Sequence, residues 1–132
     1  MATRQKNLSA LDRNKSPVGW YIGTYLVRFV EIGAKKNNSP KARFPAWWNT
    51  VVVKASSLND AYNKVAKIGH EYAAPYKGGI EAIPVQWRYV GITNLLPIYE
   101  ELEDGSEVCY CESKTTLKKL LKAVKKKSEF YQ

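Results

Sequence analysis

The longest apolar run of the chain, Trp20 to Ile32, has apolar side chains on both faces of a predicted strand. With alternation, one face carries Trp20, Ile22, Leu26, Val30 and Ile32, and the other carries Tyr21, Tyr25, Val27 and Phe29. A strand with two apolar faces has to be covered on both sides. We therefore predict a central strand, with helices above the sheet and either a loop or a second subunit below it.

A second alternating run, from Ala46 to Ser56, predicts another strand. Trp47, Val51 and Val53 share one face, and Trp48, Thr50 and Val52 share the other. The residues between the two runs, 33–45, combine Gly, Asn-Asn and Ser-Pro with four basic side chains. This composition predicts a long exposed loop.

A helical period replaces the alternation after Ser57. The stretch Ser57-Leu58-Asn59-Asp60 has the form of a capping box, in which the hydroxyl and the carboxylate bind amides of the first turn. Apolar residues then recur at helical spacing at Leu58, Ala61, Tyr62, Val65, Ile68 and Tyr72. The pattern predicts a helix that packs one stripe on the sheet, followed by a connector over residues 73–84.

The stretch from Val85 to Glu112 predicts a strand, a break and a hairpin. Pro97 cannot donate a hydrogen bond to a neighbouring strand, so the first strand should break or bulge near Leu96. Asp104-Gly105 tolerates the positive φ angles of a tight turn. We therefore expect residues 98–102 to pair with residues 107–111.

The two ends of the chain differ in pattern. Residues 115–127 carry a narrow apolar stripe (Leu117, Leu120, Leu121 and Val124) among lysines, which predicts a second helix. Residues 1–17 are polar, lack periodicity and end in Ser-Pro, as is typical of a flexible basic arm. The expected fold is α+β: one domain over residues 18–132 with a largely antiparallel sheet of four to five strands and two helices, in the order β-β-α-β-β-hairpin-α.

Composition narrows the class of protein. A chain of 132 residues suits one hydrophobic core, and its aromatic content of 12% suits sheets and interfaces. No run approaches a membrane span, and the N-terminus lacks the apolar segment of a signal peptide, so we expect a cytoplasmic protein. Cys109 and Cys111 fall on one face of a predicted strand, where we expect reduced, packed thiols.

The net charge of +9 is unevenly distributed. Bases gather in the first 16 residues, in residues 33–45 and in residues 114–127, and six acids with no base lie between Glu100 and Glu112. Part of the basic tail could lie against this acidic segment. The net charge therefore overstates any basic surface.

Three segments together resemble a known family. They are the Trp20-Tyr21 start, the run Val51 to Tyr72, and the run Trp87 to Val108, which contains WRYVG and DGSEV. In this order the segments are similar to the bacterial domain-of-unknown-function family 4288, over about residues 19–110. The resemblance implies no activity, cofactor or catalytic residue.

The sequence gives little support for catalysis. The one histidine, His70, lies near a helix end beside Glu71, and Cys109-Tyr110-Cys111 has no second Cys/His cluster to complete a zinc site. Gly78-Gly79 is not followed by a helix, so it reads as a turn and not as a phosphate-binding loop. The acids of residues 100–112 lack the spacing of a calcium loop and suit a solvated edge. We expect no enzyme, no cofactor and no metal site.

Two functions from different classes remain open. In the first, the protein is a small accessory interaction module that binds itself, most simply as a homodimer, or another protein through an aromatic sheet face. Its candidate contact or base-stacking residues are Trp20, Tyr21, Tyr25, Trp47 and Trp48. In the second, the arm, the loop and the last helix bind the phosphates of DNA or RNA, with candidate residues Lys35, Lys36, Lys41, Arg43, Lys118, Lys119, Lys122, Lys125, Lys126 and Lys127. The last helix has a short stripe without Trp, so we expect no membrane partner.

Overall fold

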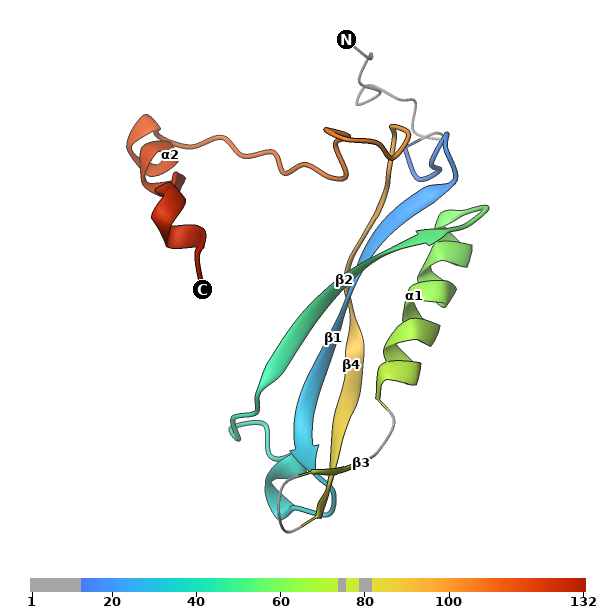
Figure 1. Ribbon diagram of the computed structural model, residues 1–132, viewed down its shortest axis with the longest axis vertical. Helices are drawn as coiled ribbons and strands as arrows, with labels where there is room; N and C mark the ends of the chain where they lie inside the picture. The colour runs from blue at the N-terminus through green and yellow to red at the C-terminus, as the bar shows by residue number, and fades with distance from the viewer. Residues whose placement is uncertain (1–12, 74–75, 79–81) are drawn as a thin grey trace.

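An antiparallel sheet with one long helix on it forms the body of the protein (Figure 1). The computed structural model describes residues 13–73, 76–78 and 82–132. The sheet order is β2-β1-β4-β3. The elements are β1 (Trp20–Glu31), the 3-10 turn η1 (Lys35–Asn38), β2 (Ala46–Lys54), α1 (Leu58–Tyr72), β3 (Tyr76–Gly78), β4 (Ile83–Pro97), α2 (Leu117–Ala123) and the 3-10 turn η2 (Lys127–Phe130).

The α+β class, the antiparallel sheet and the two helices are confirmed, but the number of strands was overestimated. Three strands are long, β1, β2 and β4, whereas β3 has three residues. In the described residues beyond Pro97 there is no strand. The sheet therefore lacks the hairpin strands that the sequence predicted.

Helix α1 begins where the capping residues predicted. The Ser57 hydroxyl accepts a hydrogen bond from the Asp60 amide at 3.0 Å, and the Asp60 carboxylate accepts one from the Ser56 amide at 3.0 Å. The first bond satisfies an amide of the first turn that the helix start leaves without a partner, and the second ties the residue before the N-cap to the helix. The residue at which α1 begins is thus set by local hydrogen bonds.

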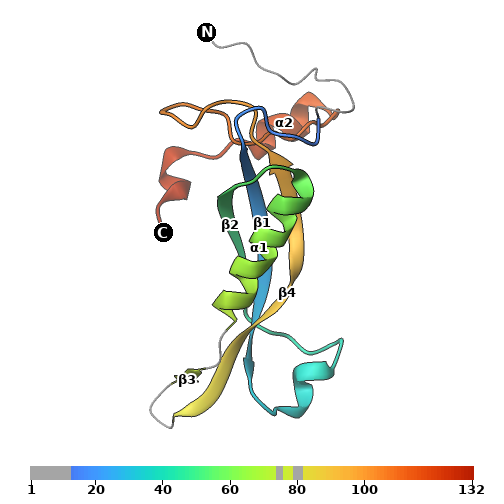
Figure 2. The ribbon, with the colours of Figure 1, turned by 90° about the vertical axis from the view of Figure 1, so that its right-hand side faces the viewer.

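The core lies between α1 and one face of the sheet (Figure 2). Tyr21 and Tyr25 from β1 are buried against Ala61 and Val65 of α1. Gly23 lies between the two tyrosines, where a Cβ atom would come within 2.7 Å of Val65. The missing side chain lets the helix approach the centre of β1.

The hairpin predicted after Pro97 was wrong in its strands but not in its turn. The turn itself forms: Gly105 has φ 85° and the Ser106 amide donates to the Glu103 carbonyl at 3.0 Å. Residues 98–102 and 107–111 nevertheless form no strands. A two-stranded ribbon that packs on no further strand or helix has little stability by itself.

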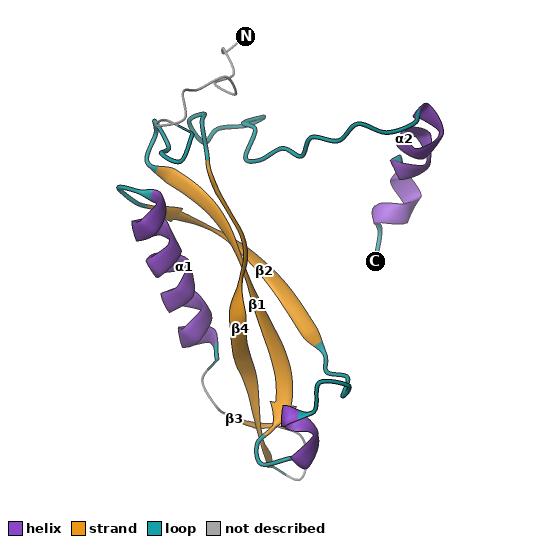
Figure 3. Cartoon of the chain, turned by 180° about the vertical axis from the view of Figure 1, so that it is seen from behind, coloured by secondary structure: helices purple, strands orange, loops and turns teal. Residues whose placement is uncertain are grey.

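The C-terminal helix also differs from the expectation. We predicted a helix over residues 115–127, but α2 ends at Ala123, and Val124 is extended with ψ 131°. Lysines four residues apart, such as Lys118 and Lys122, repel one another on a helix. Moreover, α2 does not pack on the sheet: all its residues are exposed, and Figure 3 shows it apart from the sheet at the end of an extended segment.

The last residues of the predicted arm are attached to the domain. Ser16 is buried, its hydroxyl donates to the Ile98 carbonyl, and its amide donates to the Tyr21 hydroxyl at 3.0 Å. Residues 1–12, which hold the rest of the arm, lie outside the described residues. In the part of the chain that is described, no helix has the length and apolar character of a membrane span.

Candidate interaction surface

The sheet face opposite α1 is identified from the alternation of β1. Gly23 faces Val65 of α1, so the even-numbered neighbours Ile22 and Leu26 point to the other side. Their partners across β2 and β4 extend this side, because residues directly opposite one another share a face. Val90 has no partner in the register, but it follows Tyr89, which faces Gly69 of α1, and so it points to this side as well. We call this side the helix-free face and define its apolar part as Ile22, Leu26, Trp48, Val52, Val90 and Leu96.

Large apolar side chains on this face are open to solvent. Trp48 is 61% exposed, Val52 47% and Val90 53%, and Ile22, Leu26 and Leu96 are half-buried between them. Among the described residues, no helix covers this side of the sheet, which lies to the left of α1 in Figure 1. Apolar side chains clustered on a rigid sheet are a common mark of a protein contact site.

The loop of residues 33–45 closes one end of the helix-free face. The Arg28 guanidinium donates to the Asn37 carbonyl at 2.8 Å and lies over the Phe44 ring at 4.6 Å. Asn37 in turn donates to the Glu31 carbonyl at 2.7 Å, and Val30 is buried beside these contacts. The loop predicted below the sheet therefore covers this end and leaves the middle of the face open.

The middle row of the face is polar, because Thr50, Thr24 and the exposed Asn94 lie opposite one another across β2, β1 and β4. The Thr24 and Thr50 hydroxyls are 2.8 Å apart and hydrogen-bond each other across the two strands. Because each hydroxyl has a partner in the sheet, burying the pair in an interface leaves neither of them without a hydrogen bond. The threonines therefore do not oppose docking of an apolar surface.

The five predicted contact residues fall in three places. Tyr21 and Tyr25 lie in the core beneath α1, at 0% and 4% exposure, so they belong to no surface of this structure. Trp47 lies on the α1 side of the sheet, with its ring 4.7 Å from that of Trp87. Trp20 and Trp48 are on the helix-free face.

An aromatic group around Trp87 lies near the end of α1 and is partly open to solvent, with Trp47 52% and Tyr72 39% exposed. Phe29, Trp47 and Tyr72 place their ring centroids 5.3, 4.7 and 6.4 Å from that of Trp87. These tilted and edge-on contacts are typical of packed aromatic side chains. We therefore assign this group a structural role.

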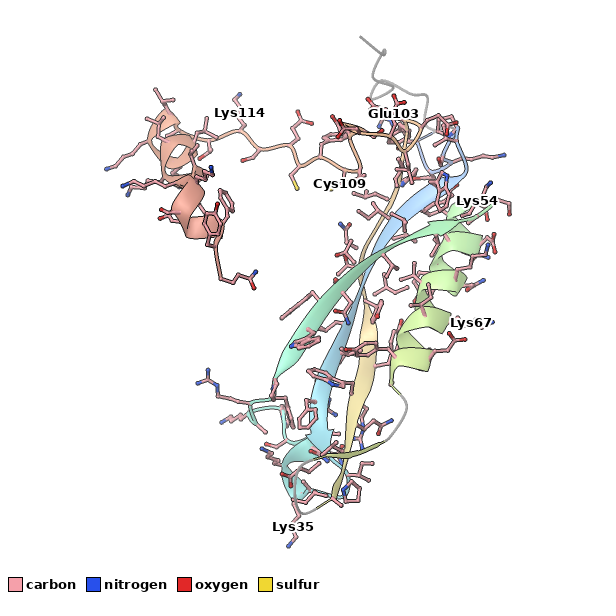
Figure 4. The ribbon with its side chains drawn as sticks, viewed as in Figure 1. Lys35, Lys54, Lys67, Glu103, Cys109 and Lys114 are labelled. Atoms are coloured by element: carbon pink, nitrogen blue, oxygen red, sulfur yellow. The ribbon has the colours of Figure 1, made fainter. Side chains whose placement is uncertain are left out.

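The candidate phosphate-binding residues form two separate groups. Lys35, Lys36, Lys41 and Arg43 are exposed on the loop near η1, and the lysines of α2 and of the segment after it are exposed as well. Figure 4 shows Lys35 and Lys114 at opposite ends of the molecule. Of the arm's bases, Arg13 and Lys15 are exposed, whereas Arg4 and Lys6 lie outside the described residues. The loop group and the C-terminal group do not form one surface.

His70, Tyr89 and Tyr99 are the titratable side chains of the described residues with notable surroundings. The ring of His70, which is exposed at the end of α1, stacks on Tyr89 at 4.0 Å between centroids. Burial, with a smaller contribution from Tyr62, raises the pKa of Tyr89, and burial likewise raises the pKa of Tyr99, whose hydroxyl donates to the Arg13 carbonyl. Within the described residues, no three His, Cys, Asp or Glu side chains could hold a metal ion.

The prediction that the two cysteines are packed was wrong. Cys109 and Cys111 are free and exposed, whereas we expected them to be packed on a strand face. The expectation depended on the hairpin, which does not form, so these residues have no sheet to pack against.

Val90 and Leu96 of the helix-free face were missed by the sequence reasoning. The register of β4 against β1 shifts twice, between Thr24 and Tyr25 and between Leu26 and Val27. Each shift adds a residue to β4 and so changes which of its residues lie on which face. Because the two shifts cancel, simple alternation from Gln86 does place Val90 and Leu96 on one face, and only Gly91 and Ile92, between the shifts, are reversed.

A family profile described as a domain of unknown function (DUF4288) matches residues 20–110. The match covers more than half of the chain and includes β1, β2, α1 and β4. The chain belongs to this family. Searches of the curated proteins and of the solved structures found no match.

Proposed function

We propose that this protein is a small, non-enzymatic interaction module that associates with a second copy of itself through the helix-free face. The observation that carries the proposal is the exposure of Trp48, Val52 and Val90 on a sheet face whose opposite side is covered by α1. Removing these side chains from water stabilises a contact by about 25 cal/mol per Å² of apolar area. A two-fold dimer is the simplest arrangement, since it lets one surface meet its own copy.

The test compares a face variant with a matched control. The face variant carries Val52→Lys and Val90→Lys, which place two charges in the proposed contact. The control, Tyr62→Lys, puts a charge at a similarly exposed position on α1, on the other side of the sheet. An uncompensated charge buried in an interface costs several kcal/mol, so the face variant should raise the dimer dissociation constant at least about 100-fold.

Light scattering after size exclusion at micromolar concentration measures the outcome. We expect the wild type and the control at about twice the chain mass of 15.0 kDa, and the face variant at the chain mass. Circular dichroism of all three proteins checks that the fold is kept. A wild-type protein that runs as a single chain with no partner present contradicts self-association.

A second candidate function uses the exposed lysines of α2. Exposed lysines are closely spaced on α2 and directly after it, at Lys118, Lys119, Lys122, Lys125, Lys126 and Lys127, which favours this segment over the loop for contacting phosphates. Binding through it would be tolerant of nucleic-acid sequence and weakened by salt.

A further inference from the structure

Helix α2 has a capped start and one apolar side, yet no part of residues 13–73, 76–78 or 82–132 covers that side. The Thr116 hydroxyl accepts a hydrogen bond from the Lys119 amide at 3.3 Å, which begins the helix. Leu117 is 70% exposed and Val124 75%, and Leu120 and Leu121 are exposed between them. A helix of 7 residues has little stability alone in water, so its apolar stripe needs a partner surface.

The same chain carries an apolar surface that lacks a covering helix. The helix-free face presents aliphatic side chains and Trp48 between β2 and β4, and α1 covers the opposite side of the sheet. Helix stripes of leucine and valine pack well on such a sheet face. The structure thus holds an apolar helix stripe and an apolar sheet face, two surfaces that can pack on one another.

Charge favours one position for the helix on this face. The acidic loop, which we define as residues 100–107, follows β4 at the rim of the face, and Glu101, Glu103 and Asp104 are exposed in it. Figure 4 shows Glu103 at that end of the sheet. If the stripe of α2 lies on the face near this rim, Lys118 and Lys119 come within reach of the carboxylates, which strengthens and orients the contact.

The lengths of the elements favour a helix from a second copy. Strand β1 has 12 residues and spans about 40 Å, whereas the 7 residues of α2 span about 10 Å. A helix from the same chain would leave most of the face open. A second copy supplies both a helix and a second helix-free face to cover the remainder.

The segment between the acidic loop and α2 is long enough for α2 to reach a second copy. Residues 108–116 form neither helix nor strand, and nine residues can span about 30 Å. Figure 1 shows this segment leading away from the sheet, on the side opposite α1. We propose that α2 of each copy docks on the helix-free face of the other copy, an inference that rests on the self-association proposed above.

The decisive experiment mixes two variants, each defective in one half of the contact. The face variant, Val52→Lys with Val90→Lys, keeps its helix. The helix variant, Leu120→Lys with Leu121→Lys, keeps its face. All four positions are exposed, so neither variant removes a core side chain. The control, Lys118→Gln with Lys119→Gln, keeps the stripe and should raise the dissociation constant less than about tenfold.

In a dimer of either variant alone, every contact between a helix and a face includes one altered surface. In the mixture, the helix of the face variant can dock on the face of the helix variant. We expect each variant alone at the single-chain mass, and a mixed species of twice that mass when differently tagged variants are combined. The helix variant alone should weaken self-association at least about tenfold.

The other outcomes separate this inference from the proposed function. A helix variant that still dimerises, beside a face variant that does not, overturns the docking of α2 and leaves self-association through the face intact. Two single-chain variants that do not complement each other also overturn the docking of α2 on a second copy. A wild type that runs as a single chain overturns both proposals.

Discussion

At the scale of single residues, the close approach of α1 to the sheet depends on two glycines. A Cβ at Gly23 would meet Val65, and one at Gly69 would lie 2.6 Å from the Tyr89 ring. Such distances force neighbouring atoms to move. The sequence shows these glycines inside a strand and a helix, where they cost stability, but only the packed structure explains why they are there.

We expect Gly23→Ala to lower the free energy of unfolding by about 1–3 kcal/mol, because the added methyl overpacks the contact with Val65. Gly91 is the matched control: it also lies in a strand, but a Cβ there meets nothing within 4 Å. Gly91→Ala should be neutral or stabilise by up to about 1 kcal/mol, since alanine restricts the unfolded chain. Urea unfolding at one protein concentration measures both, and equal effects would remove the steric explanation.

At the scale of elements, the turn predicted after Pro97 forms, but the two hairpin strands predicted on either side of it do not. Asp104-Gly105 makes the turn, and the Ser106 hydroxyl accepts from the Glu103 amide at 2.8 Å, which closes it locally. The Glu107 amide donates to the Glu100 carboxylate at 3.1 Å. Side-chain bonds of this kind satisfy the backbone without a ladder of strand bonds.

Hydrogen exchange distinguishes the two arrangements. Amides in the interior of β1, between β2 and β4, should exchange at least about 1000-fold more slowly than unstructured amides, because they open only with the domain. The amides of Val108, Cys109 and Cys111 should exchange at close to the unprotected rate. Strong protection of these three amides would restore the predicted hairpin.

At the scale of the whole molecule, the separation of the basic segments limits how nucleic acid could bind. Loop 33–45 and α2 lie at different ends of the molecule in Figures 1 and 4, so phosphates at α2 are out of contact with the loop. About four lysines of the C-terminal segment could then reach phosphates at once. Log affinity should fall against log salt with a slope of about −3 to −4.

The triple replacement Lys122→Gln, Lys125→Gln and Lys126→Gln should flatten that slope by about two to three units and leave the fold intact, because all three side chains are exposed. Replacing Lys35 and Lys36 with Gln is the control and should leave the slope unchanged. Fluorescence anisotropy with labelled DNA and RNA measures it. No binding at about 50 mM salt would leave only the protein-interaction proposal.

The sequence by itself determined the elements whose signals are local. The Ser57 and Asp60 caps and the helical spacing after Leu58 defined α1, and the Pro97 ring defined the end of β4. Within β1 and within β2, alternation correctly grouped the residues that share a face. These signals act over a few residues, so they need no knowledge of the rest of the fold.

Only the tertiary structure decided which sheet face is buried and which is open. The sequence showed that both faces of β1 are apolar, but alternation along a strand does not say which face a helix covers and which a loop or a second subunit covers. The structure places α1 on the tyrosine side, the loop over one end of the other side, and α2 on neither. Burial depends on contacts between residues far apart in the chain, which is why the tyrosines belong to the core and Trp48, Val52 and Val90 to the surface.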